Sequence, residues 1–96
     1  MDFSIPPLGT PVPTAPSGTI TSNQPTFTWS AVPLAAGYDV WLTDLTSGSS
    51  AIIGSSSTTF FTAPAPLTAG HLFRWWVRAK SNNGTLGSWS VAIDFA

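Results

Sequence analysis

The alternation of apolar and polar residues is clearest between residues 72 and 81. In an extended chain this two-residue period places apolar side chains on one face and polar ones on the other, which predicts a half-buried β-strand. The inner face would hold Phe73, Trp75, Val77 and Ala79, and the outer face Arg74, Trp76, Arg78 and Lys80. All three basic residues of the chain therefore lie on the outer face of one strand.

Shorter alternating segments, separated by Gly-, Pro- and Asn-containing turns, predict six further strands. They cover residues 18–22, 26–32, 37–46, 51–54, 58–62 and 88–95. No segment has the 3.6-residue period of a helix. Seven short strands with frequent turns predict an all-β, seven-stranded antiparallel β-sandwich of the immunoglobulin-like, Greek-key type.

The alternation also assigns side chains to faces within these strands. The second strand points Phe27 and Trp29 inward, and the third points Tyr38, Val40 and Leu42 inward and Asp39, Trp41 and Thr43 outward. In the last strand, Val91, Ile93 and Phe95 share a face. Adjacent Phe60 and Phe61 must point to opposite faces, and the pattern leaves open which of them enters the core.

Proline dominates the start of the chain, with five prolines between residues 6 and 16. Such spacing prevents a helix and disfavours a central strand, which predicts an extended linker. We therefore divide the chain into a Pro-rich linker, residues 1–16, and a sandwich domain, residues 17–96.

The composition narrows the function classes. A 96-residue chain with 43% hydrophobic residues, five Trp and six Phe can build one core. Only 7% of residues are charged and the net charge is −1, which gives no basic field for nucleic acid or an anionic membrane. No apolar run is long enough to span a bilayer. The Ser/Thr-rich, cysteine-free composition is typical of a bacterial secreted or surface protein and indicates an extracellular module.

Several residues around these strands carry a family resemblance. The segment from Leu67 through Gly70, Phe73 and on to Ala79 resembles the signature of the fibronectin type III family. Trp29, Tyr38 and Ser90 are similar to further positions of that family. The resemblance covers nearly the whole chain and implies the same sandwich fold. Phe73 stands where the family usually has a tyrosine, so a hydroxyl bond to the preceding loop is not expected.

The outer face of the sheet is the one surface for which a binding function can be argued. We expect Trp41 and Trp76 there, with Trp76 stacked between Arg74 and Arg78 in a cation–π ladder. Antiparallel pairing places Asp39 near Arg78 or Lys80, and Asp94 near Arg74. Strict alternation would turn Trp89 inward, whereas a bulge would turn it onto the ladder. Ser88-Trp89-Ser90 is similar to half of the Trp-Ser box of cytokine-receptor modules, which favours the ladder.

No constellation of catalytic or metal-binding residues is visible. His71 is the only histidine and is expected in a loop, the four carboxylates are scattered Asp residues, and no Gly-rich phosphate loop opens a helix. We therefore expect no enzyme activity, cofactor or metal. Asn83-Gly84-Thr85 fits a glycosylation sequon but is also a polar turn.

These observations predict a non-catalytic extracellular spacer module whose partners are neighbouring domains of a larger protein. The alternative is a module that binds a surface glycan or protein through Trp41, Arg74, Trp76, Arg78 and Trp89.

Overall fold

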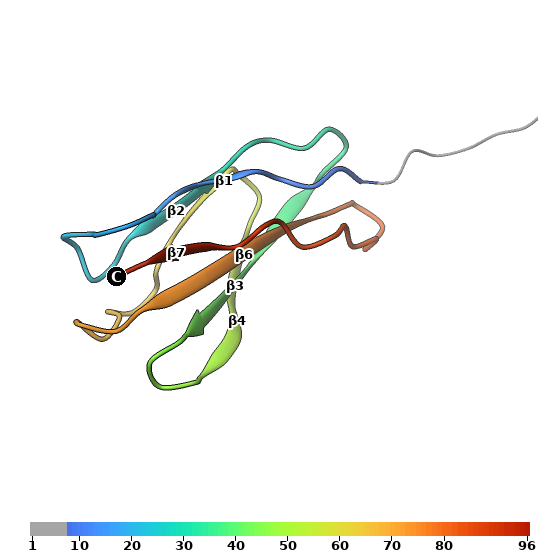
Figure 1. Cartoon of the computed structure of the whole chain (residues 1–96). Coiled ribbons are helices and arrows are strands. Elements are labelled where there is room, and N and C mark those ends of the chain that lie inside the picture. Colours follow the sequence, from blue (N-terminus) through green and yellow to red (C-terminus); the bar gives the residue numbers. More distant parts are fainter. Residues whose placement is uncertain (1–7) are drawn as a thin grey trace, which may run out of the picture.

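The computed structural model describes residues 8–96, which form two antiparallel β-sheets packed face to face (Figure 1). One sheet has the order β1-β2-β5 and the other β4-β3-β6-β7. The strands are β1 (Pro13–Ala15), β2 (Thr26–Trp29), β3 (Gly37–Asp44), β4 (Ser50–Ser56), β5 (Phe60–Thr62), β6 (Phe73–Lys80) and β7 (Ile93–Phe95). The prediction of a seven-stranded antiparallel sandwich is confirmed.

Strand β6 lies inside its sheet, with β3 on one side and β7 on the other. Its residues alternate without interruption between buried and half-buried. Trp75, Val77 and Ala79 are completely buried, as the two-residue period predicted. Because both edges of β6 are paired, its backbone is satisfied and its side chains are held on defined faces.

The core between the sheets is rich in aromatic rings. Phe27 of β2 packs edge-on against Trp75 of β6, with ring centroids 5.0 Å apart and an interplanar angle of 73°. The ring centroids of Trp29 and of Tyr38 in β3 are 5.4 Å apart. The Tyr38 hydroxyl accepts a hydrogen bond from the Val32 backbone N–H. The edge-to-face Phe27–Trp75 pair adds to the free energy gained by burial. Both pairs join residues of the two sheets.

The first strand differs from the prediction. We expected it at residues 18–22, but the strand of the three-stranded sheet is β1, at Pro13–Ala15, on the linker side of the predicted boundary. Proline has no N–H to donate and is tolerated here because β1 is an edge strand. Residues 1–7 of the predicted linker lie outside the described residues, and the division at residues 16 and 17 stays a prediction.

Residues 18–22 have another role. Gly18 N–H donates to the Asp94 carbonyl at 3.1 Å, and Ile20 N–H donates to the Ala96 carbonyl at 2.9 Å. The segment therefore covers the free edge of β7 with backbone hydrogen bonds without forming a regular strand.

The last strand is shorter than predicted. It begins at Ile93, and Val91, which was expected inside with Phe95, is 74% exposed. The reason lies at Ser90, whose Oγ accepts the Val77 N–H at 3.0 Å where a backbone carbonyl would stand in a regular ladder. This side-chain bond interrupts the alternation, so the expectation for Val91 is wrong.

The ambiguity between the two adjacent phenylalanines is also resolved. Phe61 packs against the core, whereas Phe60 is 55% exposed. The Phe61 ring lies so close to the Gly54 backbone in β4 that a Cβ at that position would overlap it. Glycine at residue 54 is therefore required by the approach of a ring from the other sheet.

Candidate binding face on the four-stranded sheet

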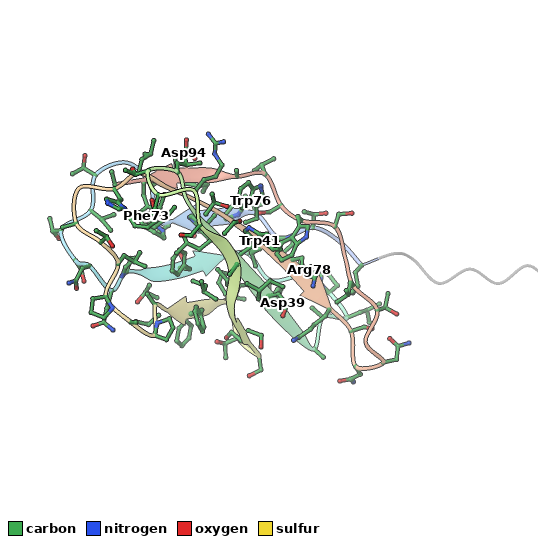
Figure 2. The ribbon with its side chains drawn as sticks, turned by 90° about the horizontal axis from the view of Figure 1, so that it is seen from below. Asp39, Trp41, Phe73, Trp76, Arg78 and Asp94 are labelled. Carbon is green, nitrogen blue, oxygen red and sulfur yellow. The ribbon has the colours of Figure 1, made fainter. Side chains whose placement is uncertain are left out.

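The predicted binding residues lie on the outer face of the sheet, where β3 and β6 pair in register. Asp39 faces Arg78 and Trp41 faces Trp76 across the two strands. Figure 2 shows Trp41 and Trp76 close together, with Arg78 and Asp39 farther along the same strands. Directly paired residues of antiparallel strands point to the same side of a sheet, so the pairing gathers these side chains on one face.

Asp39 holds two of the three cations. Its carboxylate accepts hydrogen bonds from Arg78 Nε and Lys80 Nζ, each at 3.1 Å. The Asp39 side chain is only 11% exposed, so both partners are needed to satisfy a nearly buried charge. The prediction that Asp39 lies near Arg78 or Lys80 is confirmed for both.

Arg74 forms a two-pronged pair with Asp94 of β7. Arg74 Nε lies 2.7 Å from Asp94 Oδ1, and a second guanidinium nitrogen lies 3.0 Å from Oδ2. These hydrogen bonds hold the pKa of Asp94 below its ordinary value. The predicted Arg74–Asp94 pair is confirmed, and every basic residue of the chain has a carboxylate partner.

The cation–π contact differs from the prediction. The Arg78 guanidinium lies 4.3 Å from the ring centroid of Trp89, and we had expected it over Trp76. Trp89 in turn packs edge-on against Trp41, with centroids 5.8 Å apart and an interplanar angle of 78°. The interrupted pairing at Ser90 thus directs Trp89 outward, which is the second of the two orientations the sequence left open.

Three tryptophans line a hollow on this face. It has a volume of about 440 Å³ and is lined by Trp41, Thr43, Ser50, Trp76 and Trp89. Each of the three indoles is half-buried. Trp41 Nε1 donates to Ser50 Oγ at 2.6 Å, and the Ser50 and Thr43 hydroxyls are 2.8 Å apart. Arg74 and Arg78, also proposed for this face, do not line the hollow.

Sequence reasoning missed Ser50 as a part of this site. Thr43 shares the outward period of Trp41, but Ser50 reaches the face only because it pairs with Thr43 across β3 and β4. That register depends on the length and geometry of the turn between the two strands. The available signal was the short polar turn after β3, which indicated a hairpin without specifying its register.

His71 lies away from this face and bonds to Asp44 at the end of β3. His71 Nδ1 and Asp44 Oδ2 are 2.7 Å apart. Burial acts to raise the pKa of Asp44, but hydrogen bonds from His71 and from the Ser47 and Thr46 backbone outweigh it and lower the pKa to about 2. The pair therefore ties the turn after β3 to the loop before β6, in agreement with a loop-packing histidine.

Within residues 8–96 no group of three or more His, Cys, Asp or Glu side chains is placed to hold a metal ion. In the same part of the chain, no helix is long and apolar enough to cross a membrane.

Comparison with known proteins identifies the fold. A crystal structure of a Fn3-like protein from Clostridium thermocellum is similar over 92% of this chain and 94% of its own, with 25% identity and a TM-score of 0.69. The twitchin kinase region from C. elegans is similar over 91% of this chain, which spans 16% of that protein, with 18% identity and a TM-score of 0.73. No family model and no curated protein matches the sequence.

The two sheets, their strand order and these neighbours define a class. The chain is a fibronectin type III-like β-sandwich domain, as the resemblance at Leu67–Ala79 implied.

Proposed function

We propose that the chain is a non-catalytic module that spaces or presents other domains of a larger extracellular protein. The observation that carries this proposal is where the chain enters and leaves the sandwich. Leu8 lies beside Gly87, which bonds to Ala79 near the end of β6, whereas Phe95 pairs with Phe73 at the start of β6, so the chain enters and leaves at opposite ends of the sandwich (Figure 1). Sandwiches joined through opposite ends form an extended array in which each module adds a fixed length.

The charges of the module support a non-catalytic role. Arg74, Arg78 and Lys80 are each paired with Asp94 or Asp39, and His71 is bonded to Asp44. Acid–base catalysis requires a titratable group aimed at a reacting atom in a cleft. In residues 8–96 these groups are used to hold strands and loops together, which favours a structural role for them.

A series of tandem copies tests the spacer proposal. Tandem proteins with two, three and four copies of the chain are measured by small-angle X-ray scattering. We expect the maximum dimension to rise by the same amount with every copy. Gly/Ser chains of matched length are the control, because their size grows only with about the square root of residue number. Growth like that of the control would contradict a spacer.

A second function is favoured by one specific observation, the tryptophan-lined hollow. We propose that the outer face of the four-stranded sheet binds a surface glycan or a protein through Trp41, Trp76 and Trp89, flanked by Arg74 and Arg78. Aromatic hollows with a few polar groups are common ligand sites, and the hollow here combines three indoles with two hydroxyls. Loss of partner binding on Trp76→Ala, with the fold retained, tests this role.

A further inference from the structure

The walls of the hollow leave one indole available for stacking. Trp41 and Trp76 are cross-strand partners, while Trp89 is packed against Trp41 and carries the Arg78 guanidinium over its ring. None of the ring-to-ring contacts among residues 8–96 involves Trp76. Trp89 is therefore used in holding the sheet, and Trp76 is the ring that a ligand can cover.

The hydroxyls beside these rings have hydrogen-bonding capacity left over. Ser50 Oγ accepts the Trp41 indole N–H and shares one hydrogen bond with the Thr43 hydroxyl. Only one of the two hydroxyl hydrogens is used in that shared bond, whichever residue donates it. The pair thus keeps one donor and at least one acceptor lone pair for a ligand in the hollow.

The charges around the hollow are already neutralised. Arg78 is bound to Asp39 and stacked on Trp89, and Arg74 is bound through two nitrogens to Asp94. An anionic ligand would have to compete with these carboxylates, and a cationic one would meet the guanidinium groups. The site is therefore suited to a neutral ligand with an apolar face and polar edges.

We propose that the hollow binds a neutral saccharide, with a sugar ring stacked on Trp76 and its hydroxyls bonded to Ser50 and Thr43. This inference rests on the proposed binding role of the face. A pyranose has an apolar C–H face and hydroxyls that both donate and accept, which matches the indole and the Ser50–Thr43 pair. A proline-rich peptide would also stack but offers carbonyl acceptors alone. The volume of about 440 Å³ falls within the usual range for small-ligand sites.

The experiment follows the five indole N–H signals by NMR while cellohexaose, xylohexaose or mannohexaose is added separately. At least one of these neutral hexasaccharides is expected to shift the Trp76 and Trp41 signals and to leave that of the buried Trp75 unchanged. Trp76→Ala should weaken binding roughly tenfold or more, while Trp76→Phe should retain part of it. Ser50→Ala should weaken it roughly two- to tenfold. Retention of the Trp75 signal shows that each variant is folded.

Phe60→Ala is the matched control, since Phe60 is an exposed aromatic residue on β5 of the other sheet; it should bind as the unchanged chain does. Hexagalacturonate binding as tightly as the neutral sugars would overturn the proposal. Response to decaproline alone, lost in Trp76→Ala, would overturn the saccharide assignment but support the binding role of the face. No response to any of these probes would overturn the saccharide assignment and count against the binding role, while the tandem-copy experiment still decides the spacer role.

Discussion

Arg78 lies with its guanidinium 4.3 Å from the centre of the Trp89 ring while its Nε bonds to Asp39 at 3.1 Å. The two contacts fix the arginine in one position, between a carboxylate on β3 and an indole that precedes β7. Trp89, which lies outside the strands, is thereby held against strands β3 and β6 of the sheet. The contact explains why Trp89 is held against the outer face, although no strand begins until Ile93.

We predict a measurable coupling between Arg78 and Trp89. A double-mutant cycle with Arg78→Met and Trp89→Leu, analysed by denaturant unfolding, should give an interaction free energy of about 0.5–1 kcal/mol. The matched cycle of Arg74→Met with Trp89→Leu should give a coupling close to zero, because Arg74 is bound to Asp94 instead. Equal coupling in the two cycles would show that the stacking is not specific.

Ser90→Ala should destabilise the domain by about 1–3 kcal/mol, because the buried Val77 N–H loses its acceptor. The free energy of unfolding is obtained from urea titration. Ser88→Ala, two residues earlier and exposed, should change it by less than about 0.5 kcal/mol. A Ser90→Ala variant as stable as the unchanged chain would mean that the Val77 N–H finds another partner.

Gly54→Ala should also destabilise the domain, by roughly 1–3 kcal/mol, because the new methyl group would overlap the Phe61 ring. Gly9→Ala is the control, since a Cβ there meets Val32 at an ordinary contact distance of 3.5 Å. The midpoint of thermal unfolding is measured for Gly54→Ala and for Gly9→Ala. If Phe61→Leu restores part of the stability of Gly54→Ala, the overlap with the ring is confirmed as the cause.

The domain should lose stability as the pH falls from about 4 to about 2. The pKa of Asp44 is lowered from 3.8 to about 2 in the folded protein, so the unfolded chain takes up the proton first. The contribution of the Asp44 carboxylate to the free energy of unfolding is complete above pH 4 and is lost as the pH approaches 2. Midpoints of unfolding measured between pH 5 and 2 show how steeply the stability of the domain falls with pH.

Asp44→Asn should flatten this pH dependence without abolishing it, because the pKa of Asp94 is lowered too, by its bonds to Arg74. An unchanged slope in Asp44→Asn would show that the bonds from His71, Ser47 and Thr46 do not lower the pKa of Asp44 in solution.

Much of the fold could be predicted because its signals are local. The inward residues of β6 follow from a two-residue period, and the Asp94–Arg74 and Asp39–Arg78 pairs follow once neighbouring strands are antiparallel. The first strand was misplaced because its position does not depend on a local signal. Whether a proline can lie in a sheet depends on whether that strand is at an edge, which the neighbours of Pro13 in the sheet decide.

The candidate site was predictable only in part. Trp41 and Trp76 were placed correctly on the outer face by alternation, but the partner of the cation–π contact was not. The direction of Trp89 depends on the hydrogen bonds between Val77 and Ser90, thirteen residues apart in the chain, and on the contacts of Trp89 with Arg78 and Trp41. Ser50 entered the hollow through a strand register set by a turn.

By itself, the sequence determined the seven-strand sandwich, the inner faces of β2, β3 and β6 and the cross-strand ion pairs, because the period of side chains along a strand is a property of the extended backbone. Only the tertiary structure decided where Trp89 points, which phenylalanine is buried and which side chains line the hollow. Those outcomes depend on contacts between residues distant in sequence, whose free energies arise only when the two sheets and their connecting segments are packed together.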